Sequence, residues 1–250
     1  MNAWLHMARS LLTRGDPFYP TSVSVELSRE CNRRCHYCPV SRHPSAQRVI
    51  YPGTLRLVLG RLAEFGWRGR VGVTRYAEPL LVGNLEDLVA DVKAALPGSY
   101  VFVTTNGDFL DRARHDSLVG AGVDLFDVTQ HPPHISGWRE RIDGLKASGH
   151  VYERRLTAYN NRGGTLPAKA LPAVRRFRFG CLDWLDAVVT IDGKVLMCCN
   201  DFHGKDVVGD LRTQTFRQVL RDPAVRRAKL ALMRKRAPTA TCRACLAVHG

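Results

Sequence analysis

Hydrophobic and polar positions follow two alternating patterns along the first two thirds of this chain. Apolar runs rich in β-branched residues predict strands at residues 22–27, 70–75, 100–105, 123–129 and 151–159. Between these runs, apolar residues recur at helical spacing and predict helices that begin near residues 54, 84, 109 and 136. Strands that alternate with helices form a parallel α/β sheet with right-handed crossovers. Five strands are too few to close an eightfold barrel, so we expect an open, partial (β/α) barrel.

Residues at the predicted helix ends agree with this pattern. Thr54 and Asn84 are of the types that cap the first turn of a helix, and Pro97-Gly98 is expected to stop the second helix. A short amphipathic helix at residues 3–13 precedes the first strand. The predicted helices would cover the sheet.

The pattern changes after residue 160, where periodicity is lost and glycine and proline are frequent. Further on, Asp192-Gly193 is the two-residue turn expected of a β-hairpin between residues 187–191 and 194–198. A helical pattern then runs from residue 213 to about 234, with a break near Asp222-Pro223. We therefore divide the chain into an N-terminal extension, a core, a bridge and a C-terminal unit, at residues 1–21, 22–160, 161–180 and 181–250.

Composition excludes several classes of protein. No run of about 18 apolar residues predicts a membrane span, and the N-terminus lacks the unbroken apolar core of a signal peptide. The chain has eight cysteines, which without a secretion signal indicate reduced thiols in the cytoplasm and hence metal binding.

The net charge of +14 predicts a surface that attracts anions. Much of the excess lies between residues 221 and 236, which we interpret as a solvated helix face. A nucleic-acid surface is less favoured, since no aromatic residues alternate with these charges. A zinc-stapled nucleic-acid-binding module nevertheless remains the alternative from a different functional class.

Three cysteines, Cys31, Cys35 and Cys38, follow the first predicted strand with C-x3-C-x2-C spacing. Thiolates hold iron–sulfur clusters, and a cubane of four irons ordinarily needs four. Three thiolates would leave one iron open, and an open metal position is where chemistry takes place. A structural zinc site is the alternative.

A second set of cysteines lies in the C-terminal unit. The four candidates for a saturated second cluster are Cys181, Cys198, Cys242 and Cys245, with the last pair in a C-x2-C loop. Cys199 is interpreted as a spare thiol that could replace Cys198. Zinc held by the same four thiolates is again the alternative.

The first cysteine loop, with the aromatic Tyr37 before its last cysteine, resembles the signature of the radical S-adenosylmethionine (SAM) superfamily. The second set resembles the SPASM unit of such enzymes, or its shortened twitch form. The resemblance implies SAM bound to one 4Fe-4S cluster, and a second, auxiliary 4Fe-4S cluster. The segment Tyr76-Ala77-Glu78-Pro79 is similar to a Gly-Gly-Glu-Pro motif that contacts the SAM amino group in that family.

Polar residues at the ends of later strands suit the hydroxyls and carboxylate of SAM. These predicted cofactor contacts, beside Tyr37, Ala77 and Glu78, are Asn106, Gln130 and His131. The segments 105–110, 128–131, 161–164 and 187–190 further resemble the 2-deoxy-scyllo-inosamine dehydrogenase family. In that family a 5′-deoxyadenosyl radical oxidises a secondary hydroxyl to a ketone, and the auxiliary cluster takes up an electron.

By this resemblance, Arg162 would contact the substrate hydroxyl and Tyr76 would line the substrate pocket. Arginine is a poor general base because its pKa exceeds about 12, so stabilising a developing alkoxide is the expected role. Thr104 and Cys199-Asn200 depart from the tyrosine and the Phe-Glu pair of that family.

We therefore expect a radical SAM dehydrogenase that acts on a carbohydrate or aminocyclitol in aminoglycoside-like natural-product biosynthesis. A flavodoxin- or ferredoxin-type protein would reduce it. A radical SAM enzyme that epimerises or cross-links a peptide is the alternative within the superfamily; the short segment before residue 23 has no room for a leader-binding domain, which favours the small molecule.

Overall fold

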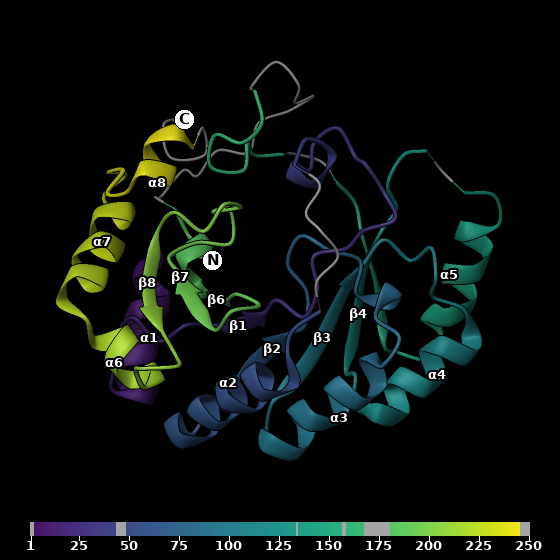
Figure 1. Cartoon of the computed structure of the whole chain (residues 1–250), viewed down its shortest axis with the longest axis horizontal. Coiled ribbons are helices and arrows are strands. Elements are labelled where there is room, and N and C mark those ends of the chain that lie inside the picture. Colours follow the sequence, from purple (N-terminus) through teal and green to yellow (C-terminus); the bar gives the residue numbers. More distant parts are fainter. Residues whose placement is uncertain (1–2, 44–48, 134, 157–158, 168–180, 246–250) are drawn as a thin grey trace.

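A computed structural model describes residues 3–43, 49–133, 135–156, 159–167 and 181–245. Its centre is one curved sheet with strand order β5-β4-β3-β2-β1-β6-β7-β8 (Figure 1). All neighbours from β5 to β6 are parallel, and β7 and β8 are antiparallel additions. The sheet does not close among the described strands, so the predicted open, partial barrel is confirmed.

The first part of the chain alternates strands and helices as predicted. After α1 (Ala3–Arg14), its elements are β1 (Ser22–Val25), α2 (Pro52–Phe65), β2 (Arg70–Gly72), α3 (Leu85–Ala95), β3 (Tyr100–Thr105), α4 (Arg112–Ala121), β4 (Leu125–Thr129), α5 (Trp138–Lys146) and β5 (Val151–Arg154). The helices α2 to α5 lie along the outside of the curved sheet (Figure 1).

The last part of the chain extends the same sheet. Its elements are β6 (Asp186–Val189), β7 (Lys194–Leu196), β8 (Val207–Asp210), α6 (Phe216–Arg221), α7 (Pro223–Met233) and α8 (Ala240–Ala244). β6 lies parallel to β1, with Ser22 opposite Asp186 and Val25 opposite Val189. The predicted hairpin is therefore joined to the barrel strands by backbone pairing.

Alternation along the strands separates the core from the cavity. On β1, Val23 and Val25 are fully buried and belong to the core that the outer helices cover. Ser22 and Ser24 point to the opposite face, because successive side chains of a strand alternate. The inner face of the partial barrel consequently carries serine side chains from β1.

The predicted helix caps agree with the structure only in part. Thr54 does not cap α2, which begins at Pro52 after an N-cap, Tyr51, that makes no side-chain bond. Proline is well suited to the first helical turn because it has no N–H to satisfy. Asn84 occupies the N-cap position of α3 without a side-chain bond, whereas Asp111 caps α4 by accepting from the Arg114 amide at 2.7 Å.

The C-terminal elements also differ in detail from the prediction. The hairpin turn is one residue longer than expected, since the Thr190 amide bonds to the Lys194 carbonyl across residues 191–193. Strand β8 was not predicted. The helical pattern does break at Asp222, whose side chain accepts from the Ala224 and Val225 amides at the start of α7. Cys242 lies in helix α8 rather than in a loop.

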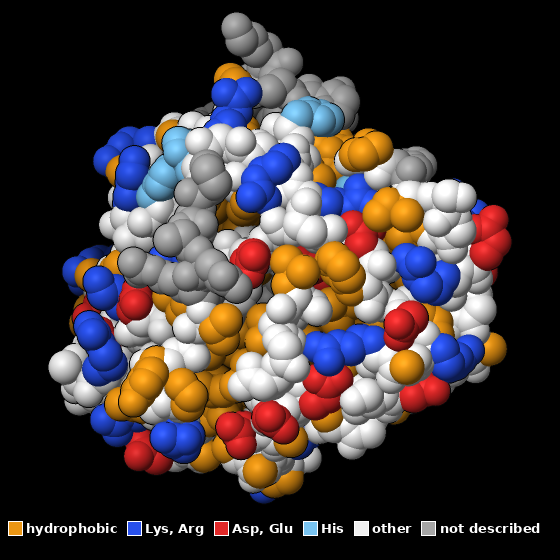
Figure 2. Space-filling model, turned by 45° about the vertical axis from the view of Figure 1, so that its right-hand side comes forward, with side chains coloured by type: hydrophobic (Ala, Val, Ile, Leu, Met, Phe, Trp, Pro, Cys, Tyr) orange, Lys and Arg blue, Asp and Glu red, His pale blue; other side chains and the backbone are white. Residues whose placement is uncertain are grey.

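The basic segment 221–236 is not a uniformly solvated face. Lys229 is only 5% exposed and lies 5.2 Å from the centre of the Trp184 ring, and Arg226 is ion-paired with Asp16. On the face shown in Figure 2, Lys and Arg side chains are scattered among acidic and apolar ones. Among the described helices, none has the length and apolar character needed to cross a membrane.

Candidate active site

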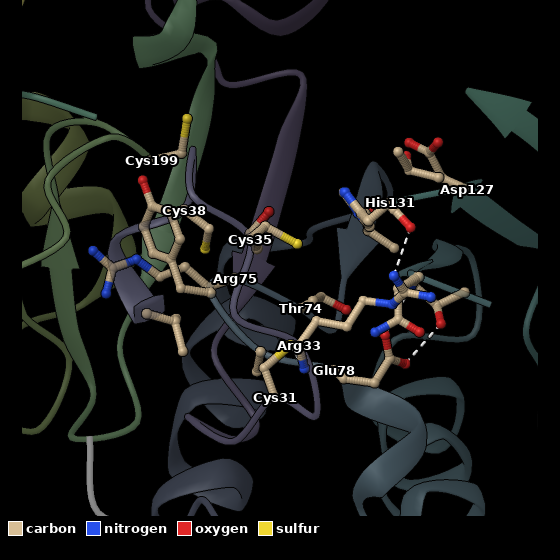
Figure 3. Close-up of a pocket in the computed structure, with 18 of the residues that line it drawn as sticks. Cys31, Arg33, Cys35, Cys38, Thr74, Arg75, Glu78, Asp127, His131 and Cys199 are labelled. Atoms are coloured by element: carbon tan, nitrogen blue, oxygen red, sulfur yellow. Dashed lines mark hydrogen bonds between the residues drawn. The ribbon is translucent and has the colours of Figure 1, made fainter. Parts of the chain in front are cut away.

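A cavity of about 470 Å³ occupies the inner face of the partial barrel. Its walls include side chains from the loop after β1, from the ends of β2 to β5, and from the C-terminal unit. All three cysteines of the first loop and Cys199 lie around it (Figure 3). The cavity therefore joins residues that are far apart in the sequence.

The first cysteine loop is compact. The Cys38 amide bonds to the Cys35 carbonyl at 2.9 Å, and the Arg33 amide donates to the Cys31 sulfur at 3.4 Å. Burial is the main cause that raises the pKa of Cys31, to about 11. Such a thiol ligates as a thiolate only when a bound metal compensates for burial.

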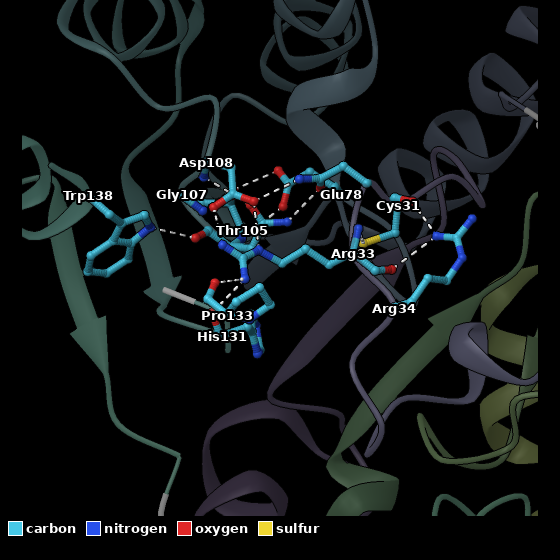
Figure 4. A network of polar contacts seen from close by, with 12 residues as sticks. Cys31, Arg33, Arg34, Glu78, Thr105, Gly107, Asp108, His131, Pro133 and Trp138 are labelled. Atoms are coloured by element: carbon cyan, nitrogen blue, oxygen red, sulfur yellow. Dashed lines mark hydrogen bonds and ion pairs between the residues drawn. The ribbon is translucent and has the colours of Figure 1, made fainter. Parts of the chain in front are cut away.

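Arg33 fastens this loop to the neighbouring strand ends (Figure 4). Its guanidinium contacts both oxygens of Asp108, at 2.6 and 2.7 Å, and donates to the carbonyls of His131 and Pro133 at 2.5 and 2.8 Å. Sequence analysis missed Arg33 and Asp108 as site residues. Their only signal was position, since Arg33 lies within the first cysteine loop and Asp108 lies within the segment 105–110.

Glu78 is buried at the carboxyl end of β2 and is 1% exposed. Its side chain accepts hydrogen bonds from the Thr105 hydroxyl at 2.6 Å and from the Asn106 amide at 2.8 Å. Burial raises the pKa of Glu78 to about 7 in spite of these bonds. A carboxyl group in this setting is suited to a cationic ligand, which would favour its ionised form.

Most predicted cofactor contacts lie together in the cavity wall, including Tyr37, Ala77, Glu78, Asn106 and His131. The Tyr37 hydroxyl lies 2.7 Å from His131 Nδ1, and burial lowers the pKa of His131 to about 4. The imidazole is therefore neutral at physiological pH. Gln130 is not among the lining residues, because Thr129 and His131 take the cavity-facing positions of this segment.

Arg162 and Tyr76, the predicted substrate contacts, are stacked at the side of the cavity nearest the C-terminal unit. The guanidinium carbon lies 5.7 Å from the centre of the Tyr76 ring. Arg162 Nε and the Tyr76 hydroxyl are buried and have no hydrogen-bond partner in the described structure. Buried polar groups are normally bonded, so both are available to a ligand.

The turn that carries Arg162 packs against α8. Arg162 has a φ of 47°, which is uncommon for a residue with a side chain. A Cβ atom at Gly163 would lie 2.3 Å from Thr241, and one at Gly164 would lie 2.5 Å from Ala244. The two glycines thus allow this turn to approach the helix that holds Cys242.

The second set of thiols is collected in a small apolar core. Cys181, Cys242 and Cys245 are each 6% exposed and pack in one cluster with residues that include Phe18 and Trp184. Cys198 approaches from the end of β7, and its sulfur accepts from the Asn200 amide at 3.3 Å. Burial is the largest cause of a raised pKa at Cys181 and Cys242.

Cys198 and Cys199 differ in their surroundings. Cys199 lines the main cavity, together with Tyr76 and Arg162, whereas Cys198 does not. This arrangement favours Cys198 as the fourth ligand of the second set.

Comparison with known proteins bears on this site. The family model of the Radical SAM superfamily matches residues 25–160. The chain belongs to the radical SAM superfamily. A second model, SPASM, described as an iron–sulfur cluster-binding domain, matches residues 181–246 of this radical SAM enzyme. The predicted SAM-binding 4Fe-4S cluster and the auxiliary cluster are thereby confirmed as its cofactors.

Two relatives and one solved structure indicate which kind of radical SAM enzyme this chain resembles. The radical SAM chain is 32% identical over 199 residues to the S-adenosyl-L-methionine-dependent 2-deoxy-scyllo-inosamine dehydrogenase of Niallia circulans, covering 77% of this chain and 78% of that protein. It is 34% identical over 117 residues to a GTP 3',8-cyclase of Mycobacterium sp. (strain KMS), covering 44% and 31%. The crystal structure of BtrN in complex with AdoMet and 2-DOIA superposes with a TM-score of 0.78 at 28% identity, covering 90% and 92%. The prediction that this chain is a radical SAM dehydrogenase is confirmed.

The residues present fit these cofactors. Three thiols at the cavity wall match the ligand number of a cubane with one open iron. Glu78 offers a buried carboxyl to an amino group beside them. Three thiols of the second set, those of Cys181, Cys242 and Cys245, lie together in one enclosed apolar cluster.

Proposed function

We propose that this enzyme oxidises a secondary hydroxyl of an aminocyclitol or a related carbohydrate to a ketone. The observation that carries the proposal is the pairing of Arg162 with Tyr76 in the cavity, each with a buried donor that no described residue satisfies. The name of the Niallia circulans relative supports an aminocyclitol substrate.

The two metal groups would be held by different cysteines. Cys31, Cys35 and Cys38 would bind the cluster that carries SAM, with Glu78 at the SAM amino group. Cys181, Cys198, Cys242 and Cys245 would bind the auxiliary cluster. When bound, these groups supply the means to remove a hydrogen atom from carbon and an acceptor for the second electron.

The chain's own residues would handle the hydroxyl group. Arg162 donates to the hydroxyl oxygen and stabilises the negative charge that develops as the hydroxyl proton passes to solvent water, because guanidinium remains charged at neutral pH. The Tyr76 ring lies beneath the guanidinium and limits its movement. Polar side chains on the inner strand face, such as Thr74 and Thr104, suit a substrate rich in hydroxyl groups.

The proposal extends to the reductant and the compartment. An acidic electron-transfer protein of the flavodoxin or ferredoxin type suits the net charge of +14. All eight cysteines are free, which suits a reducing cytoplasm.

Anaerobic incubation with SAM, a reductant and 2-deoxy-scyllo-inosamine tests the proposal. We expect a product lighter by two hydrogens, formed with one 5′-deoxyadenosine per turnover. A product of unchanged mass would indicate redox-neutral chemistry, and no reaction with any cyclitol or sugar would refute the substrate class.

A further inference from the structure

Among the described residues, three that line the cavity carry carboxyl groups: Glu78, Asp127 and Asp186. Asp127 is neutralised by Arg154, whose guanidinium contacts both of its oxygens. Glu78 and Asp186 have no ion pair with any described residue. Within the described part of the chain, two carboxyl groups of the cavity are therefore left to pair with cations brought by ligands.

These two groups lie at opposite ends of the cavity. Glu78 follows β2 at the carboxyl edge of the sheet, beside the first cysteine loop. Asp186 is the first residue of β6 and pairs with Ser22, the first residue of β1, so it lies at the amino edge. A ligand at Asp186 would thus be distinct from the ligand at Glu78.

Two serine hydroxyls hold the Asp186 side chain. Ser22 donates to Oδ1 at 2.8 Å, and Ser24 lies 3.0 and 2.8 Å from the two oxygens. A carboxylate offers about four acceptor positions, so these two donors leave room for others. The site is preformed by β1 and β6.

The charges nearest to Asp186 do not neutralise it. Arg70 favours the ionised form, but its guanidinium lies over the Phe102 ring at 4.7 Å and makes no ion pair with Asp186. Asp183 opposes ionisation, and burial is the largest cause that raises the pKa of Asp186. Burying a carboxylate is costly unless a cation compensates.

We propose that Asp186, held by Ser22 and Ser24, binds a cationic amino group of the substrate at the amino-edge end of the cavity. The inference rests on the proposed function and adds to it the group by which an amino-substituted ring is recognised. A metal ion does not suit this position, because one carboxylate and two hydroxyls are too few ligands for a hard cation. An ammonium group needs only the acceptor positions that remain.

The test uses reconstituted, SAM-loaded enzyme and two ring compounds. One is 2-deoxy-scyllo-inosamine, and the other is the same ring with a hydroxyl in place of the amino group. Titration calorimetry under anaerobic conditions gives the Kd of each, and product analysis gives turnover. Asp186→Asn is compared with Asp91→Asn, at an exposed position on α3.

We expect wild type and Asp91→Asn to bind the amine more tightly than the hydroxyl compound. Asp186→Asn should raise the Kd of the amine about tenfold or more, the size of a lost charge-assisted hydrogen bond, and leave the hydroxyl compound within about twofold. Iron content and SAM cleavage without substrate should be unchanged, which shows that the variant folds.

The proposal would be overturned if Asp186→Asn weakened the binding of both compounds equally or left the binding of both unchanged. So would a wild type that binds neither compound or does not prefer the amine. Selective binding of the amine without oxidation would instead refute the proposed function while the role of Asp186 stands.

Discussion

Arg162 donates a hydrogen bond to the side-chain oxygen of Asn200 across 3.3 Å. Asn200 in turn donates to Asp183 at 2.5 Å, so a neutral amide connects the buried guanidinium to a carboxylate of the C-terminal unit. Asp183 also lies near the sulfurs of Cys198 and Cys199. The group that we assign to the substrate hydroxyl is thus oriented by the unit that carries the auxiliary cysteines.

Arg162→Lys should lower turnover about 100-fold, because lysine cannot reproduce the fixed fork of donors and loses its stacking on Tyr76. The Kd of SAM should change less than about threefold, since Arg162 is not among the proposed SAM contacts. Asn200→Ala should also lower turnover, but by a smaller factor, and should likewise leave the Kd of SAM nearly unchanged. Single-turnover product formation and SAM titration measure the two quantities, and equal turnover in Arg162→Lys and wild type would eliminate its role.

Replacing Cys31, Cys35 and Cys38 together by alanine should remove about half the iron, one cubane of two, and all reductive SAM cleavage. Iron analysis and the yield of 5′-deoxyadenosine check this expectation. Continued SAM cleavage in the triple variant would contradict the assignment of these thiols.

Cys198→Ala and Cys199→Ala form a matched pair. The first should lose or destabilise the auxiliary cluster, and the second should retain both clusters because Cys199 faces the main cavity. Mössbauer spectra of enzyme reconstituted with ⁵⁷Fe distinguish the two. Iron loss in Cys199→Ala with full retention in Cys198→Ala would reverse the assignment.

SAM affinity should depend on pH through Glu78. Its pKa is raised to about 7, and a cationic amino group prefers the ionised carboxylate, so protonation weakens binding below that pH. Between pH 6 and 8 the ionised fraction rises about tenfold, and the Kd of SAM should fall by about the same factor. Glu78→Gln should bind SAM weakly with a flat profile. The same slope in that variant would assign the titration to another group.

Lys229 should destabilise the fold at neutral pH. Burial lowers its pKa to about 8, whereas the unfolded chain titrates near about 10.4. Between these two pKa values the unfolded state binds more protons than the folded state, so the free energy of unfolding rises with pH. The contribution of Lys229 to stability is therefore least favourable below pH 8. Lys229→Met should raise the apparent Tm at pH 7 by about 2–8 °C, for a gain of about 1–2 kcal/mol. Anaerobic calorimetry with Lys194→Met, exposed on β7, as the control checks this, and a lower Tm would contradict it.

The sequence predicted most of the parallel part of the fold because its signals are local. The strand at residues 100–105 was predicted with the bounds that the structure has, since an apolar run ends there at a turn. Strand β8 was missed because Val207 and Val208 form too short an apolar run between charged residues. Its pairing with β7 is a tertiary contact that a local pattern does not encode.

In the candidate site, too, residues with a local sequence signal were predicted and residues placed by tertiary contacts were not. The cysteines were found by spacing, and Glu78 by a motif. Arg33 and Asp108 were not found, since their ion pair joins residues 75 positions apart in the sequence. Asp186 was not singled out, because its place in the cavity depends on the pairing of β6 with β1.

That pairing determines how the protein can be divided. In a truncated chain that ends before residue 181, strand β6 would be missing. Strand β1 would then be an edge strand of the sheet, with the backbone of residues 22–25 unpaired on one side. Unpaired edges of this kind recruit strands from other molecules. The cysteine-bearing C-terminal unit therefore also protects the edge of β1 by pairing with it. Removal of this unit should cause aggregation rather than give a smaller enzyme with one cluster.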